Sequence, residues 1–179
     1  EACYLQDRTG ATLEEIDSAV KFKLGFPMGI FELADFTGMD VIHKATMEMH
    51  SRDKKVINPH NMVEKMFNEK KLGQKSGEGY YKYSDDKYER VELSEKLAEK
   101  CNPIQLVANI LNNAAWLITN GASDIEEIEK AAKLGLGLKK PIFETAKEFG
   151  IDNIINELNT LAEKYGKFYE PDTLLNSLK

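Results

Sequence analysis

The sequence has few residues of the kinds that mark metal sites, disulfide frameworks and nucleic-acid contacts. It holds 2 cysteines, 3 histidines and 1 tryptophan in 179 residues, and 30 Asp and Glu outnumber 24 Lys and Arg. A net charge of −6 lacks the basic surplus of nucleic-acid-binding domains, so we expect no nucleic-acid partner. The two cysteines, Cys3 and Cys101, form no C-x-x-C pair, so neither a zinc site nor a disulfide is indicated. We therefore expect a protein of a reducing, cytoplasmic compartment.

Long apolar runs and secretory signals are also missing. The stretch from Cys101 to Ser123 has no charged residue, but its asparagines and its proline are too polar for the core of a membrane. We predict instead a helix over about 103–120 that is buried among protein neighbours, and no membrane partner. The first residues, EACYLQDRTG, show no basic-then-apolar pattern. The 42% hydrophobic and 30% charged residues that remain are typical of one ordinary domain or two small ones.

The chain repeats itself when it is shifted by 112 positions without a gap. Identical pairs include Ala2 and Ala114, Leu5 and Leu117, Ile16 and Ile128, Gly25 and Gly137, Phe31 and Phe143, Gly38 and Gly150, Asp40 and Asp152, and Pro59 and Pro171. Because glycines and prolines coincide, we interpret 1–83 and 103–179 as two copies of one helical unit, with a linker over 84–102. The alternative is two unrelated helical segments that share common residues.

Each copy carries the same signals for helix starts and stops. Thr12 and Glu15 have the spacing of a capping box for a helix over about 13–24, and Asp124 and Glu127 are predicted to do the same in the second copy. Glycines are expected to end these helices and to break the helices that follow them: Gly25, Gly137, Gly38 and Gly150.

The later part of each copy continues the helical pattern. Asp40 and Asp152 suit the N-terminal end of a longer helix, where capping and the helix dipole favour Asp. Pro59 and Pro171 suit the first turn of a final helix. Tyr80–Tyr83 is the one candidate for a short extended segment. The sequence therefore predicts an all-α protein.

The offset also predicts that the first copy is incomplete. The helix over 103–120 would begin about nine residues before Glu1 in the first copy, where EACYLQDR keeps only its last turns. We therefore expect the chain to be a piece of a longer protein.

The run LEEIDSAVKFKLGFPMGIFELADFTGMDVI resembles the C-terminal domain of the 3-hydroxyacyl-CoA dehydrogenase family, which carries an acidic helix start and then G-x-P-x-G-P-F-E-L-x-D-x-x-G-x-D. Ile30 stands where the family usually has proline. LGQKSGEGYYKY is similar to the family's L-G-x-K-[ST]-G-x-G-F-Y-x-Y, with Tyr80 for phenylalanine. The second copy has lost the P-x-G core at 139–143. The resemblance implies two tandem helical domains, like the 6-phosphogluconate dehydrogenase C-terminal domain, packed as a pseudo-dimer.

The resemblance also implies an oxidoreductase of fatty-acid β-oxidation. The family oxidises 3-hydroxyacyl-CoA to 3-ketoacyl-CoA and passes hydride to NAD, which binds an upstream dinucleotide-binding domain. The glycine fingerprint of that domain is not found in this sequence, so we expect NAD in the full-length enzyme and no cofactor on this fragment. The family's substrate-contacting Asn would lie just before residue 1, so no residue here is given a catalytic role. The helical region would close one side of the acyl-CoA cleft and assemble domains or a homo-oligomer, and would be inactive alone.

Four residues are candidates for substrate binding. Pro27, Met28 and Gly29 form the P-x-G turn, where methionine suits a flexible acyl chain. Lys75 lies in the glycine-rich segment, and we expect it to contact either a CoA phosphate or an acidic neighbour. The segment does not match a P-loop, because Gln74 precedes Lys75 and a helix rather than a strand comes before.

Other interpretations stay open. The chain could belong to a related β-hydroxyacid or nucleotide-sugar dehydrogenase, or could be a non-catalytic helical interaction module. We expect no metal site, because the three histidines, His43, His50 and His60, lack the i, i+4 spacing of a compact zinc site. The acidic cluster of Glu14, Glu15 and Asp17 is interpreted as compensation of a helix dipole.

Overall fold

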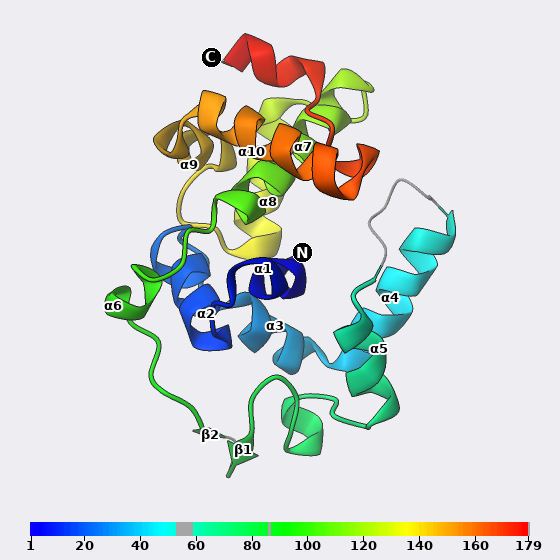
Figure 1. Cartoon of the computed structure of the whole chain (residues 1–179), viewed down its shortest axis with the longest axis vertical. Helices are drawn as coiled ribbons and strands as arrows, with labels where there is room; N and C mark the ends of the chain where they lie inside the picture. The colour runs from blue at the N-terminus through cyan, green and yellow to red at the C-terminus, as the bar shows by residue number, and fades with distance from the viewer. Residues whose placement is uncertain (53–58, 86, 179) are drawn as a thin grey trace. The chain divides into compact units, whose positions relative to one another are not determined.

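The computed structural model describes residues 1–52, 59–85 and 87–178, and these residues are mainly helical (Figure 1). The predicted all-α class is confirmed. Within the described ranges the sheet is a small antiparallel hairpin, in which β1 (Tyr83–Ser84) pairs with β2 (Lys87–Tyr88). The extended segment predicted at Tyr80–Tyr83 is therefore a strand only at its last residue.

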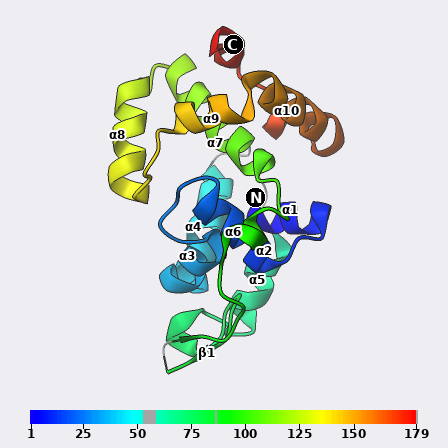
Figure 2. The same ribbon diagram turned by 90° about the vertical axis from the view of Figure 1, so that its left-hand side faces the viewer.

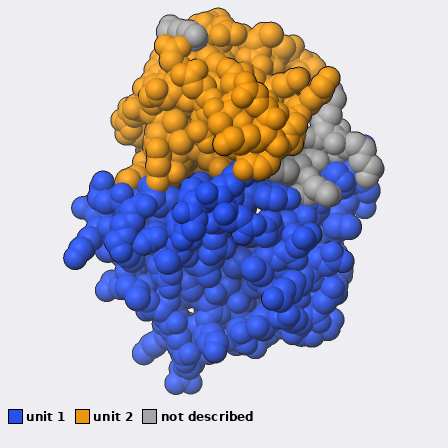
Figure 3. Space-filling model, in the orientation of Figure 1, with its two compact units in different colours: residues 1–20, 28–101 blue, residues 21–27, 102–179 orange. Residues whose placement is uncertain are grey.

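The chain divides into two compact units. Unit 1 consists of residues 1–20 and 28–101, and unit 2 of residues 21–27 and 102–179 (Figure 3). The short segment 21–27 groups with unit 2, where Leu24 is buried and the Gly25 carbonyl accepts a hydrogen bond from the Lys139 N–H at 3.4 Å.

Unit 1 is built from short helices joined by tight turns. They are α1 (Ala2–Thr9), α2 (Leu13–Phe22), α3 (Ile30–Thr37), α4 (Met39–Arg52), α5 (Asn61–Asn68), the 3₁₀ helix η1 (Gln74–Ser76) and α6 (Glu95–Ala98). The last two residues of α2 group with unit 2. The core of unit 1 includes Leu5, Ile16, Phe31, Met39, Met66 and Tyr81, each at most 4% exposed.

Unit 2 is organised around one long helix, α7 (Ile104–Thr119), which packs against four of the five elements that follow it. These are α8 (Ile125–Leu136), α9 (Ile142–Phe149), α10 (Ile151–Tyr165) and η3 (Thr173–Leu178), with η2 (Lys167–Tyr169) before η3 (Figure 2). The helix predicted over 103–120 is confirmed. Its asparagines fit because the amides of Asn109 and Asn113 donate to carbonyls one turn earlier, at 2.9 Å. None of the described helices is both long enough and apolar enough to cross a membrane.

The predicted helix caps are correct in unit 1 and half correct in unit 2. Thr12 Oγ1 accepts from the Glu15 N–H at 3.2 Å, and Glu15 Oε2 accepts from the Thr12 N–H at 3.0 Å. Asp124 likewise accepts from the Glu127 N–H at 2.9 Å. The Glu127 carboxylate does not complete that box, however, because it accepts from the hydroxyl of Ser123.

Three of the four glycine stops are confirmed, whereas the prolines were placed wrongly. Gly137 ends α8 with a φ of +65°, and the breaks at Gly38 and Gly150 have φ of +98° and +83°. The helix predicted over about 13–24 ends at Phe22, three residues before Gly25, which has a φ of +74°. These are backbone conformations that favour glycine. In unit 1 the N-cap of α5 is His60, one residue after Pro59, and η3 in unit 2 also begins beyond Pro171. Both prolines therefore precede the first turn.

Candidate functional site

The first part of the site is the carboxylate of Asp17, which holds the start of α3. Asp17 projects from α2 and is 0% exposed. Its two oxygens accept from the backbone N–H groups of Phe31 at 2.8 Å and Glu32 at 3.0 Å, and Oδ2 also accepts from the Tyr81 hydroxyl at 2.9 Å. The dipole-compensating role expected for this residue within its own helix is wrong. Asp17 instead satisfies two N-terminal amides of the next helix.

Burial makes the Asp17 carboxyl a weaker acid. It raises the pKa of Asp17 from 3.8 to about 6, although the three hydrogen bonds favour the charged form and oppose the shift. The folded chain therefore holds a proton on Asp17 at mildly acidic pH, where the unfolded chain would not.

The P-x-G turn, residues Pro27 to Gly29, is held in place by its contact with the Asp17 side chain. Gly29 is buried, and a Cβ at its position would overlap the side chain of Asp17. The Gly29 N–H donates to Glu32 Oε2 at 2.8 Å, and the other oxygen of Glu32 pairs with Arg90. The Arg90 guanidinium also lies over the ring of Tyr88, 4.4 Å from its centroid. A buried ion pair thus ties the turn to the segment after β2.

A second buried carboxylate, Asp35, organises the glycine-rich segment. Its oxygens accept from the N–H groups of Tyr80 at 2.8 Å and Tyr81 at 2.9 Å, and from the Tyr83 hydroxyl at 2.8 Å. Gly79 is needed because a Cβ there would overlap the Asp35 carboxylate and lie 2.6 Å from the Gly73 Cα. Gly73 and Gly79 of LGQKSGEG therefore let the backbone pass close to Asp35. Burial raises the pKa of Asp35.

Beside this network unit 1 has an apolar groove of about 420 Å³. It lies between the start of α1, one side of α3, α4 and the start of α5, and its walls include Phe31, Ile42, Met49 and Tyr80. The rings of Phe31 and Tyr80 lie 4.6 Å apart. This volume and apolar lining are in the range of sites that hold a ligand or another apolar segment.

The polar side chains that line the groove include Cys3, Tyr80 and His60. The Cys3 thiol and the Tyr80 hydroxyl lie 3.2 Å apart. Burial raises the pKa of the Cys3 thiol, which makes it a poor nucleophile. His60 accepts from the Met62 N–H with Nδ1 at 3.1 Å, and its Nε2 lies 2.8 Å from the Asp7 carboxylate. The imidazole therefore joins α5 to α1.

The four predicted substrate residues differ in their surroundings and do not form one cluster in the structure. Pro27 is exposed and groups with unit 2, whereas Met28 is half-buried and groups with unit 1. Gly29 lies against Asp17, as described above. The Lys75 ammonium pairs with the Asp40 carboxylate. Of the two contacts expected for Lys75, the structure thus shows the acidic neighbour.

The histidines are dispersed among structural contacts. His43 stacks on Phe67 with parallel rings 4.2 Å apart, and His60 caps α5. Across the part of the chain that the structure describes, no three His, Cys, Asp or Glu side chains gather as they would around a metal ion. Both cysteines are buried, and they are not joined in a disulfide.

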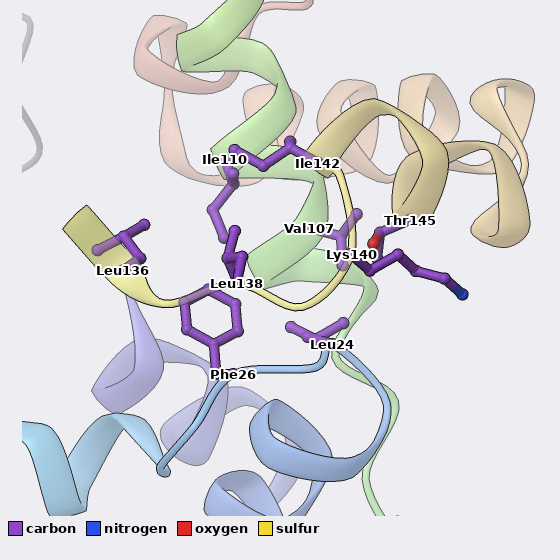
Figure 4. A pocket seen from close by; sticks show the side chains of 9 residues that line it. All are labelled: Leu24, Phe26, Val107, Ile110, Leu136, Leu138, Lys140, Ile142 and Thr145. Carbon is purple, nitrogen blue, oxygen red and sulfur yellow. The ribbon is translucent and has the colours of Figure 1, made fainter. Parts of the chain in front are cut away.

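Unit 2 has a smaller apolar pocket, of about 30 Å³ (Figure 4). Phe26, Val107, Ile110 and Leu138 are among the side chains that line it. Lys140 contributes its aliphatic part and pairs its ammonium with Glu148, away from the pocket. This volume is far below that of sites that hold a small molecule, so we assign no ligand to this pocket.

Sequence reasoning missed Asp17 and Asp35 as organising residues, although a signal was present. Asp17 continues the spacing of Leu13 and Ile16, which places it on the apolar face of α2. Asp35 follows Phe31 by four residues and shares its buried face of α3. An acidic residue on an apolar stripe must be partnered when the stripe is buried, and this is the sign of a buried cap.

The glycine-rich segment gives a first prediction. Gly79→Ala should destabilise the protein by ~3–5 kcal/mol, because its methyl group has no room beside Asp35. Gly77→Ala is the matched control: its Cβ would meet nothing within 4 Å, so only the φ of +77° opposes it, at about 1–2 kcal/mol. Urea unfolding followed by circular dichroism measures both. Equal losses would show that Asp35 does not set the position of Gly79.

Asp17 gives a second prediction. Because its pKa rises from 3.8 to about 6 on folding, folding takes up a proton between these values, and this group makes the protein less stable as pH rises from about 4 to about 6. Asp17→Asn should remove this component, worth up to about 3 kcal/mol. Tyr81→Phe removes a hydrogen bond that lowers the Asp17 pKa, so it should enlarge the component. The free energy of unfolding, measured at about pH 4 and about pH 6, gives the size of this component. If Asp17→Asn leaves the slope of that free energy with pH unchanged, Asp17 is not the group that causes it.

Comparisons of the sequence and of the fold with known proteins point to one family. The sequence profile of the 3-hydroxyacyl-CoA dehydrogenase C-terminal domain matches residues 1–83 and 105–178. The chain is 40% identical over 85 residues to the hydroxyacyl-coenzyme A dehydrogenase, mitochondrial, of Rattus norvegicus, which covers 46% of this chain and 27% of the rat protein. A probable 3-hydroxyacyl-CoA dehydrogenase of Caenorhabditis elegans is 38% identical over 85 residues, with 46% and 28% covered. The chain thus spans little more than a quarter of these relatives.

Solved structures share the fold at lower sequence identity. The 3-hydroxybutyryl-CoA dehydrogenase of Escherichia coli aligns with a TM-score of 0.77 at 20% identity, over 98% of this chain and 56% of that one. The dehydrogenase part of a multifunctional enzyme from C. elegans aligns with a TM-score of 0.67 at 21% identity, over 99% and 45%. The profile match covers well over half of the residues, and it includes Asp17, Gly29, Asp35 and Gly79. The chain therefore belongs to the 3-hydroxyacyl-CoA dehydrogenase C-terminal domain family.

Proposed function

We propose that this chain is the helical part of an NAD-dependent enzyme that oxidises 3-hydroxyacyl-CoA to 3-ketoacyl-CoA in fatty-acid β-oxidation. The observation that carries the proposal is the family match over 1–83 and 105–178. The structure of the two family motifs supports it. The buried carboxylate of Asp17 holds the residues after the P-x-G turn, and the buried carboxylate of Asp35 holds the glycine-rich segment.

The proposal includes two tandem copies of the family domain, over 1–83 and 103–179, with 84–102 between them. Equivalent contacts in the two units support it. Asp17 in α2 and Glu129 in α8 lie at matching positions of the 112-residue offset. Glu129 accepts from the N–H groups of Ile142 and Phe143, each at 2.8 Å, as Asp17 does at the start of α3. In the proposed enzyme the copies pair within one chain, as two subunits of a dimer would.

The described residues do not fit NAD. A dinucleotide binds at the edge of a parallel sheet, with its pyrophosphate at a glycine-rich turn that opens a helix. In the ranges that the structure describes, the sheet is the hairpin of β1 and β2, and the glycine-rich segment leads into a single 3₁₀ turn. The proposal therefore assigns NAD and the chemical step to a separate dinucleotide-binding domain, and derives no step through the cofactor here.

The role proposed for this chain is to close one side of the acyl-CoA cleft and to assemble the enzyme. In the P-x-G turn of Pro27, Met28 and Gly29, the exposed Pro27 and the half-buried Met28 would face the acyl group, and Gly29 would let the turn approach Asp17, which fixes it. Lys75 would meet a CoA phosphate. It is half-exposed in its pair with Asp40, so an arriving phosphate could share the ammonium.

The activity assay tests the proposed function. The chain alone, given acetoacetyl-CoA and NADH, should show no turnover, because the described residues do not form a dinucleotide site. Joined at Glu1 to the dinucleotide-binding domain of a 3-hydroxyacyl-CoA dehydrogenase, it should oxidise NADH with acetoacetyl-CoA.

Two results of this assay would contradict the proposal. One is turnover by the chain alone. The other is a joined protein that binds NADH, as measured by fluorescence, but prefers small β-hydroxy acids to the acyl-CoA substrate. That preference would indicate the related β-hydroxyacid dehydrogenases instead.

The role of Lys75 has its own test in the joined enzyme. Lys75→Gln should raise the KM for acetoacetyl-CoA about tenfold with little change in kcat, since a charge-assisted contact to phosphate contributes ~1.5–3 kcal/mol. Asp40→Asn is the matched control, because it breaks the same ion pair but leaves the ammonium available. If both variants change KM equally, or neither does, Lys75 only holds Asp40.

A further inference from the structure

The segment that follows β2, residues 89–101, is packed on unit 1, and we call it the strap. It groups with unit 1, and its residues Leu93 and Ala98 are 7% and 1% exposed. The Ser94 N–H donates to Ser18 Oγ at 3.3 Å, which ties the strap to α2. The family profile leaves this segment unmatched, so the family match assigns no role to it.

Arg90 is the strap residue that carries a charge into the interior. Its side chain is 9% exposed, and its guanidinium lies 5.1 Å from the ring centroid of Tyr81 and 4.4 Å from that of Tyr88. One terminal nitrogen pairs with the Glu32 carboxylate, and the other donates to the Val91 carbonyl at 2.9 Å. Because a guanidinium stays charged and planar, these partners fix both its place and its orientation.

The carboxylate of Glu32 connects Arg90 to the P-x-G turn. The Glu32 side chain is 6% exposed, and its second oxygen accepts from the Gly29 N–H at 2.8 Å. A buried carboxylate that loses its counter-charge is strongly destabilised and is drawn towards water. Gly29 would then lose its acceptor. The position of the turn, and of the Met28 side chain within it, therefore depends on the strap.

We propose that Arg90 is a positioning residue of the acyl-CoA cleft: from the strap, its guanidinium orients the Glu32 carboxylate, which holds Gly29 and thereby sets where Met28 meets the acyl chain. This inference rests on the proposed function, which places the P-x-G turn against the acyl group. Arg90 itself contacts neither the substrate nor the cofactor. The strap is thus a part of substrate binding as well as a connection along the chain.

Hydrogen exchange in the full 179-residue chain tests the effect on the turn. Arg90→Gln should speed the exchange of the Gly29 amide about tenfold or more, and the amides of α5, in another part of unit 1, should change less. Lys100→Gln is the matched control. It removes another cation of the strap, which pairs with Glu15 at 3.4 Å, and it should leave Gly29 unchanged. Equal acceleration at Gly29 and in α5 would show that Arg90 only stabilises unit 1, and this result, like no acceleration at all, overturns the proposal.

A double variant tests whether Arg90 acts through Glu32. Each single variant, Arg90→Gln or Glu32→Gln, leaves one buried charge without its counter-charge, whereas the double variant leaves none. Exchange of the Gly29 amide should therefore be slower in the double variant than in either single variant. If the two effects add instead, the residues act independently and the proposal is wrong.

Kinetics of the joined enzyme test the connection to the acyl chain. Arg90→Gln should raise the KM for a long-chain 3-ketoacyl-CoA about fivefold and that for acetoacetyl-CoA less, with little change in kcat, because a binding contact along the chain is lost. Arg90→Lys keeps a charge for Glu32 and should recover most of the KM, and it also serves if the Gln variant does not fold. Equal changes in KM for the two substrates overturn the proposal.

The two kinds of measurement separate this inference from the proposed function. If the unmodified joined enzyme shows no turnover, the proposed function fails, and the place of Arg90 in the cleft fails with it, even where Gly29 responds. If that enzyme is active but Arg90→Gln changes neither the exchange of Gly29 nor the KM, the proposed function stands and only the role of Arg90 is wrong.

Discussion

A carboxylate that accepts two backbone N–H groups from the next helix sets the path of the chain in both units. The first turn of a helix has amides with no partner inside the helix, and burying them unpaired is costly. Asp17 meets this need for α3, and Glu129 meets it for α9. Each carboxylate also fixes how closely two consecutive helices approach. The turn between the helices is therefore determined by a side chain that lies outside it.

In unit 1 the same principle joins parts of the sequence that lie far apart. Asp35 belongs to FELAD, and the amides that it accepts belong to GYYKY, some 45 residues later. Gly73 and Gly79 are required because the backbone at these two residues passes close to that aspartate. The Tyr81 hydroxyl then reaches Asp17, so the two carboxylates share one network. Two motifs that read as separate in the sequence are one structural element.

Much of this fold follows from local sequence. Short-range patterns predict the capping box at Thr12, the glycine stop at Gly137 and the uncharged helix α7, and all three are present in the structure. The errors arise where another side-chain contact competes with the predicted one. Glu127 was expected to complete a capping box, but its Oε2 accepts from the hydroxyl of Ser123. His60 rather than a proline starts α5, because its imidazole serves the helix and Asp7 together.

The candidate site was harder to foresee than the fold. Spacing shows that Asp17 lies on an apolar stripe, but not which amides it will meet, because its partners come from another helix. The groove is beyond local patterns altogether. It is formed by side chains from α1, α3, α4 and α5, whose proximity depends on the packing of the whole unit.

The two versions of the carboxylate cap differ in a way that constrains how each sequence can change. Glu129 is longer than Asp17 by one methylene and meets amides one position earlier in its helix, which leaves room for Pro141 where unit 1 has Gly29. Pro141 has no N–H to satisfy, and Glu144, at the position of Glu32, is exposed. In unit 1 a proline at residue 29 would overlap Asp17 and leave Glu32 without its backbone donor. The acid and the turn residue are therefore epistatic: each is tolerated only with its own partner, and the two positions should be inherited as a pair.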